Sequence, residues 1–106
     1  MPLLVVLSTF PDLAAARDAA QTLVQENLAA CVNLLPGAES HYHWEGIIET
    51  SQEVLAIIKT TAERYPELEK RLQELHPYDV PEIVALPAVA VAESYLAWVT
   101  KNSQPA

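Results

Sequence analysis

The stretch from His76 to Ile83 holds the side chains with the most evident chemistry in this chain. It reads His-Pro-Tyr-Asp-Val-Pro-Glu-Ile, so an imidazole and two carboxylates lie close together in sequence. Each proline fixes its own φ and biases the residue before it, His76 or Val80, toward extended geometry. We expect a stiff loop in which His76 and Glu82 serve as ligands of a divalent cation. The alternative is a structural corner, where His76 ends a helix and Glu82 bonds to backbone amides.

His41 and His43 form a second candidate metal site. They are two residues apart in a segment with strand character, and Glu45 follows at the same spacing. Side chains two apart lie on the same face of a strand, so both imidazoles can reach one ion. Imidazole suits copper, zinc and nickel. The alternative is that both side chains are simply solvated on an outward face.

Signals for catalysis are weak. Ser8, His76 and either Asp12 or Asp79 could be combined into a triad on paper, but the sequence has no nucleophile-elbow motif and no evident oxyanion hole. Cys31 is the only cysteine, so it cannot form an internal disulfide, and it lies in an apolar run typical of a core thiol. We therefore predict a protein that is not an enzyme.

Composition narrows the class of partner. The chain has 106 residues and 51% hydrophobic residues, which fits one domain spanning residues 1–106 with one core. Its formal net charge is −8, which argues against nucleic-acid and anionic-membrane partners and is compatible with cations and basic partners, as in any acidic protein. The apolar N-terminal run lacks a basic region and is too short for a signal peptide, so we expect a cytoplasmic protein.

The first half of the chain predicts a strand, a helix and a long hairpin. Asp12 is the expected N-cap of the helix. Pro36-Gly37 predicts a bulge or edge within the second strand, and Glu45-Gly46 predicts a two-residue turn. Apolar periodicity gives the expected ranges: strand 3–8, helix 13–27, strand 30–35 resuming at Ser40, and strand 47–60.

The second half predicts a helix, a short strand and a terminal helix. The helix has two possible starts: Thr60 with Glu63 has capping-box spacing, whereas Pro66 fits the first helical position. The helix ends before Pro77, and the remaining expected ranges are strand 82–86, helix 91–100 and a frayed tail 102–106. The order β-α-β-β-α-β plus a helix predicts an α+β, ferredoxin-like sandwich.

The length of the hairpin indicates an oligomer. A strand from residue 47 to residue 60 spans roughly 46 Å at about 3.3 Å per residue. A compact domain of this size is only roughly 33 Å across. The hairpin would overhang its own core, with Tyr42 and Trp44 on one face, and exposed strand edges invite pairing with another chain. The alternative is a bend near Ser51.

A set of short motifs spread over roughly residues 3–99 matches one known family in order and spacing. The matching elements are Thr9-Phe10-Pro11, Leu28 to Asn33, Pro36-Gly37, Ser40 to Gly46, Lys59-Thr60, His76 to Ile83, and Tyr95 with Trp98. On these elements the chain resembles the CutA family of divalent-cation-tolerance proteins. The resemblance implies a ferredoxin-like homotrimer whose long strands pair between subunits, and kinship in architecture with the PII signal proteins. It also implies an association with copper or other divalent cations, but no required cofactor and no reaction.

The sequence departs from the family at positions that matter for copper. Some members have a cysteine where this chain has Ser8 and a histidine where it has Leu75, and both are implicated in copper binding there. Of that set only His76 remains here. Many members also have a lysine where this chain has Ile47.

Three functions follow as hypotheses. The first is a non-enzymatic homotrimer that binds divalent cations, with Cu²⁺ the leading candidate. The second is a PII-like module that binds a small effector in clefts between subunits. The third is a trimeric scaffold that binds a partner protein. The aromatic residues expected in the clefts or interfaces are Tyr42, Trp44, Tyr78, Tyr95 and Trp98.

Overall fold

The computed structural model describes residues 2–105, so Met1 and Ala106, the ends of the predicted domain and tail, lie outside it. Within this range no helix is long and apolar enough to cross a membrane. The elements follow in the order β1 (Leu3–Phe10), α1 (Leu13–Gln25), β2 (Cys31–Trp44), β3 (Ile47–Thr61), α2 (Tyr65–Leu75), β4 (Val84–Pro87) and α3 (Glu93–Asn102). The predicted β-α-β-β-α-β order with a final helix is confirmed.

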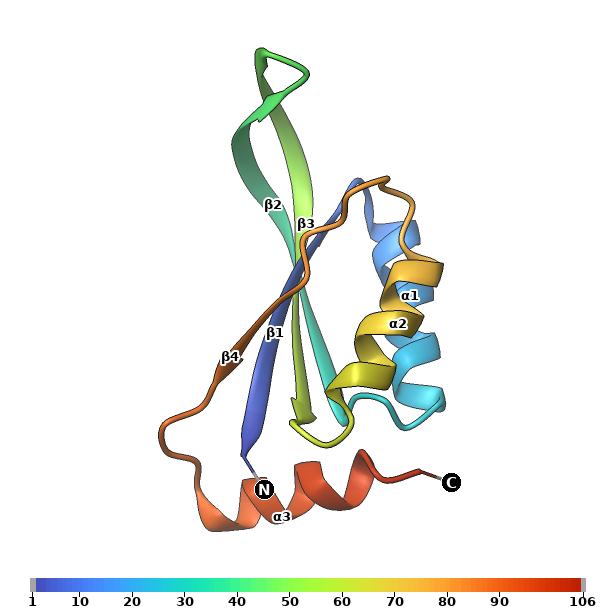
Figure 1. Cartoon of the computed structure of the whole chain (residues 1–106), viewed down its shortest axis with the longest axis vertical. Helices are drawn as coiled ribbons and strands as arrows, with labels where there is room; N and C mark the ends of the chain where they lie inside the picture. The colour runs from blue at the N-terminus through green and yellow to red at the C-terminus, as the bar shows by residue number, and fades with distance from the viewer. Residues whose placement is uncertain (1, 106) are drawn as a thin grey trace.

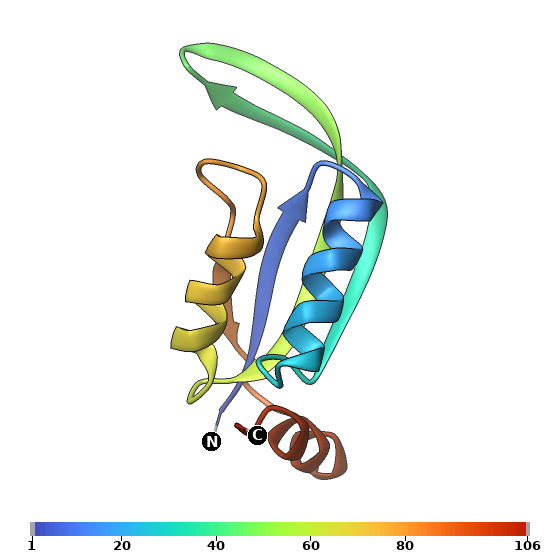
Figure 2. The same ribbon diagram turned by 90° about the vertical axis from the view of Figure 1, so that its right-hand side faces the viewer.

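The four strands form one antiparallel sheet in the order β2-β3-β1-β4. Helices α1 and α2 lie side by side on one face of this sheet (Figures 1 and 2). Helix α3 crosses only one end of the opposite face, where Val99 packs with Leu3 and Ala30. The α+β prediction is therefore confirmed for the single chain. The rest of the face opposite α1 and α2, here called the helix-free face, has no helix over it (Figure 1).

The core lies between the sheet and the two helices. Alternate residues of β1 point into it, including Val6 and Phe10, and both are almost fully buried. Leu23 of α1 and Leu72 of α2 meet them from the helices. This packing fixes the end of β1 that carries Thr9 and Phe10 against the end of α2, which positions His76.

Helix α1 begins where the sequence predicts and ends slightly earlier. Asp12 is the N-cap, and its carboxylate accepts a hydrogen bond from the Ala15 amide at 2.8 Å. The helix ends at Gln25 rather than at the predicted Asn27. Asn27 has φ 58°, a left-handed conformation that stops the helix and that asparagine tolerates better than most residues.

Helix α2 begins as the proline predicts. Arg64 precedes the first turn, and Pro66 occupies one of its first positions. The capping-box alternative is wrong: the Thr60 hydroxyl is buried and donates to the Leu28 carbonyl at 2.7 Å, so it cannot cap a helix.

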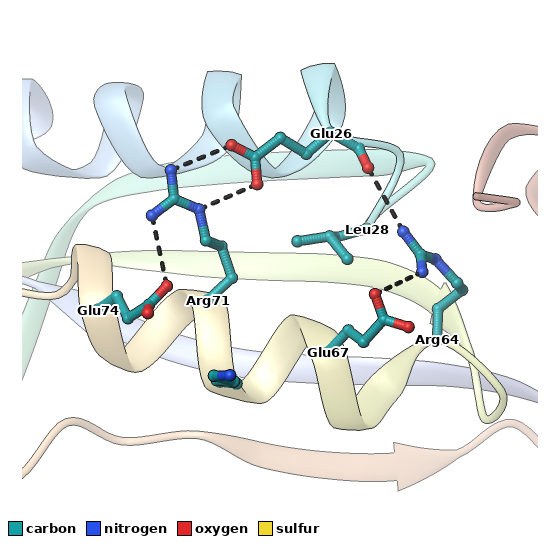
Figure 3. A pocket seen from close by; sticks show the side chains of 7 residues that line it. Glu26, Leu28, Arg64, Glu67, Arg71 and Glu74 are labelled. Carbon is teal, nitrogen blue, oxygen red and sulfur yellow. Dashed lines mark hydrogen bonds and ion pairs between the residues drawn. The ribbon is translucent and has the colours of Figure 1, made fainter. Parts of the chain in front are cut away.

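A depression lies between the end of α1 and α2, and ion pairs fill it (Figure 3). Arg64, only 5% exposed, donates to the backbone carbonyls of Asn27 and Glu26 and to the Glu67 carboxylate at 3.2, 3.4 and 2.9 Å. These bonds satisfy carbonyls that the end of α1 leaves without helical partners. Arg71 holds Glu26 through two bonds of 2.9 and 3.0 Å. The bonds of Arg64 and Arg71 thus form a clamp that holds the two helices together, and the depression is structural.

The hairpin of β2 and β3 both projects and bends. The pairing shifts between Leu35 and Ala38, with Gly37 at φ 88°, so the predicted bulge is confirmed. Glu45 and Gly46 have φ of 50° and 79°, which makes the predicted tight turn. The molecule is 44 Å long, and the hairpin supplies its far end (Figure 1). Figure 2 shows the outer half curving over the loop between α2 and β4.

The ends of the last two elements also differ from the prediction, and α3 begins at Glu93 rather than at residue 91. β4 begins at Val84, because the segment containing Pro81 and Glu82 stays outside the ladder. The predicted frayed tail is wrong at its start: Asn102 ends α3, and Ser103 is 1% exposed and donates to the Val99 carbonyl.

Candidate functional site

A polar cluster lies where the bent hairpin passes over the loop between α2 and β4. Its members are His76 and Tyr78 from the loop and Glu53, Ser51 and Tyr42 from the hairpin. The Tyr78 hydroxyl donates to the Glu53 carboxylate at 2.5 Å, and the hydroxyls of Tyr42 and Ser51 are 3.2 Å apart. Because Glu53 is only 8% exposed, the cluster contains a carboxylate largely withdrawn from water.

His76 is fixed at both ring nitrogens. Its Nε2 lies 2.8 Å from the Thr9 carbonyl oxygen, and its Nδ1 accepts from the Tyr78 amide at 3.2 Å. A carbonyl can only accept and an amide can only donate, so the neutral ring carries its hydrogen on Nε2. The ring also stacks on Phe10 with centroids 4.3 Å apart. Metal ligation through either nitrogen would require His76 to give up one of these bonds.

Burial sets the protonation of this cluster. Desolvation lowers the pKa of His76 below its ordinary value, and the Thr9 carbonyl and the charge of Glu53 offset this only in part. Desolvation, then the hydrogen bond to Glu53, raises the pKa of Tyr78. At neutral pH the cluster therefore presents a neutral imidazole and a neutral phenol.

Among the described residues, Glu82 makes no hydrogen bond or ion pair with His76. It is exposed, and within residues 2–105 it has no side-chain hydrogen bond or ion pair. The carboxylate that meets the loop is Glu53 instead. Sequence reasoning missed Glu53 because its partner Tyr78 is distant in sequence. The available signal was a glutamate directly before the apolar run that begins at Val54.

The histidine pair lies on the outer half of the hairpin. His41 Nε2 lies 2.7 Å from Glu39 Oε2, and His41 Nδ1 lies 3.0 Å from the Thr50 hydroxyl. His43 shares this face by strand alternation and is exposed. The expected third member, Glu45, occupies the turn, so Glu39 is the carboxylate that meets His41.

The part of the chain that the structure describes does not gather a full set of metal ligands. Residues 2–105 contain no group of three or more His, Cys, Asp or Glu side chains placed to hold one ion. Ser8 is fully buried, and its hydroxyl has no hydrogen-bond partner among residues 2–105.

Comparison with known proteins identifies the family. A family model described as CutA1 divalent ion tolerance protein matches residues 4–102. The chain belongs to the CutA1 family. A divalent-cation tolerance protein CutA from Thermus thermophilus is 48% identical over 99 residues, which cover 93% of this chain and 96% of that protein.

Solved CutA structures have the same fold. CutA1 from Oryza sativa superposes with a TM-score of 0.94 at 40% identity, covering 98% of this chain and 95% of that one. CutA from Xylella fastidiosa gives a TM-score of 0.94 at 43% identity, covering 96% and 98%. The resemblance noted from the motifs is thus confirmed, and the relatives carry the name of a cation-tolerance protein rather than of an enzyme.

Proposed function

We propose that this CutA protein is a non-enzymatic homotrimer that binds divalent cations, copper above all, in clefts completed by a second subunit. Membership in a divalent-cation-tolerance family supports the cation class. The single observation that carries the assembly is the composition of the helix-free face.

That face carries several large apolar side chains that are exposed, together with polar residues such as Glu49 and Lys59. Partners opposite each other in an antiparallel ladder share a face, so the pairing places the side chains of Trp44 and Ile47 together, and those of Leu7 and Val84 together. Large exposed apolar side chains gathered on one face favour an interaction site there. The exposed members of the face are Leu35, Tyr42, Trp44, Ile47, Val84 and Leu86, at 38–62% exposure, and Tyr95 and Trp98 of α3 adjoin it.

The sheet also has two unlike free edges. β2 and β4 are its outer strands, and β2 runs from Cys31 to Trp44. Pairing the β2 edge of one copy with the β4 edge of the next is a head-to-tail contact, and such contacts form a ring when the rotation from copy to copy closes. A ring of three agrees with the trimer that the family resemblance implies.

The cluster beneath the hairpin is the proposed cation site. Glu53 supplies a carboxylate, and His76 can supply an imidazole once its bond to the loop is released. Glu82, His41 and His43 are further candidate ligands, because they are exposed and can meet a neighbouring subunit.

Cytoplasmic localisation remains a prediction.

Calorimetric titration with Cu²⁺ tests the cation site. We expect Glu53→Gln and His76→Gln each to weaken Cu²⁺ binding at least tenfold, with the exposed Glu63→Gln as a matched control. His41 and His43, changed together to alanine, test the second candidate site. Unchanged affinity in all of these variants would contradict both sites.

A small-effector module is the second candidate function. Tyr42, Ser51 and Tyr78 place hydroxyl groups at the same cluster, and hydroxyls with aromatic rings suit organic ligands as well as ions. A saturable thermal shift with one metabolite, lost in Tyr78→Phe, would favour this function. A trimer that responds to neither metal nor metabolite would favour a scaffold.

A further inference from the structure

Lys59 carries a positive charge on the helix-free face. The pairing places it in one row with Cys31 on one side and Val5 and Leu86 on the other. Lys59 is partly buried, its ammonium donates to the Asn33 side-chain carbonyl, and it lies 3.8 Å from the Cys31 sulfur. An amide and a thiol are the polar groups that meet this ammonium.

No carboxylate balances this charge within residues 2–105: the ion pairs there join Glu39, Glu26, Glu67 and Glu74 to other cations. Arg17, Lys70 and Lys101 also have no ion pair among these residues, but they are exposed, whereas Lys59 is partly buried. Covering this face with another subunit would withdraw the ammonium further from water, which is costly unless an anion accompanies it. The covering surface should therefore bring a carboxylate.

Glu49 is exposed on the same face but lies in the outer hairpin, so the carboxylate beside the β4 edge is Glu82. It is exposed and has no side-chain partner among the described residues. It lies two positions before Val84, so the alternation of an extended chain puts it on the same face as Val84 and Leu86. Lys59 points toward β2, whereas Glu82 adjoins β4, at the opposite edge of the sheet.

A head-to-tail ring brings these two edges together. When the β2 edge of one copy meets the β4 edge of the next, the helix-free faces continue across the seam. We infer that Lys59 of one subunit pairs with Glu82 of the neighbouring subunit across this seam, so that a second copy of this chain supplies the missing anion. This inference rests on the proposed trimer and deepens it by naming a charge pair that closes it.

Whether Lys59→Met raises or lowers the trimer dissociation constant tests this pair. Lys59→Met replaces the ammonium by an apolar side chain of similar length in an apolar surrounding. If Glu82 pairs with Lys59, the variant leaves a carboxylate uncompensated in the seam, and the trimer dissociation constant should rise more than tenfold. If Lys59 has no partner, removing its charge should tighten the trimer.

Sedimentation equilibrium of the full chain measures this constant. We expect Lys59→Met and Glu82→Gln to weaken the trimer alike, and the charge-swapped double variant Lys59→Glu with Glu82→Lys to restore assembly relative to either charge reversal alone. Lys70→Met, an exposed lysine on α2, is the matched control and should change nothing. Because Glu82 is exposed, its variant tests the pair even where a change at Lys59 impairs folding.

The outcomes separate this inference from the proposed assembly. A parent protein that is not a trimer would contradict the proposed function itself. A trimeric parent whose assembly is unaffected or tightened by Lys59→Met overturns the pair alone. A trimer that is weakened by Lys59→Met but not by Glu82→Gln also overturns the pair. The pair is overturned as well if citrate stabilises the parent trimer but not the Lys59→Met trimer, because Lys59 would then bind a small-molecule anion.

Discussion

Ser8 contains a buried hydroxyl that should destabilise the protein. Its side chain is fully buried in β1, and its Oγ has no hydrogen-bond partner in the described part of the chain. Folding therefore removes this group from water without replacing its hydrogen bonds. Replacing Ser8 with alanine removes the polar atom and preserves the backbone, so we expect Ser8→Ala to stabilise the chain.

The magnitude follows from two opposing terms. Relief of an unsatisfied buried hydroxyl returns about 1–3 kcal/mol. The void left by one oxygen atom, about half of a water's ~30 Å³, costs about 0.4 kcal/mol at ~24 cal/mol per Å³. The net expectation is a gain of about 1–2 kcal/mol, or several degrees in the melting temperature of a domain of this size.

Thr60→Val is the matched control, because Thr60 is equally buried but its hydroxyl donates to the Leu28 carbonyl at 2.7 Å. Removing this donor leaves a carbonyl unsatisfied, so Thr60→Val should lose about 1–2 kcal/mol. Urea unfolding at one fixed protein concentration measures both variants, since assembly makes stability depend on concentration. A loss of stability in Ser8→Ala similar to that in Thr60→Val would refute the reasoning and show that Ser8 is bonded.

Three further predictions concern the histidine, the tyrosine and the interhelical clamp. The pKa of His76 is lowered in the folded chain, so the unfolded chain takes up a proton first as the pH falls. The free energy of unfolding should therefore decrease as the pH drops below about 6.5. His76→Gln should make this decrease smaller in urea titrations between pH 7.5 and 5. Tyr78→Phe removes the donor to the buried Glu53 carboxylate and should cost about 1–3 kcal/mol, also measured by urea unfolding. Arg64→Met should lower the free energy of unfolding by about 2–4 kcal/mol, because three acceptors lose their donor. Arg71 is more exposed, so Arg71→Met should change the melting temperature little. Equal effects of the two variants would contradict the assignment of the clamp to Arg64.

Local chemistry explains why the elements were predictable. Asp12, Pro66 and Glu45-Gly46 act on neighbouring backbone, so a helix start or a turn can be predicted from a few residues. The continuous apolar run of β1 likewise predicts a central strand, although β1 continues beyond Ser8 to Phe10.

The candidate site was less predictable because its contacts join distant segments. Glu53 meets Tyr78 only because the bulge bends the hairpin over the loop, and a sequence pattern gives the bulge but not the direction of the bend. Proline spacing predicted that the loop around His76 is constrained. The two bonds of its ring depend on where β1 ends against α2, which follows from packing.

The central claim is that the trimer, and not the single chain, is the cation-binding unit. Native mass spectrometry of the parent protein with limiting Cu²⁺, Zn²⁺ and Mg²⁺ tests it most directly, because each assembly and its bound metal are weighed together. We predict a trimer that retains copper in a fixed ratio per subunit, while dissociated monomer retains none. A metal-free trimer, or a monomer that holds copper on its own, would contradict the claim.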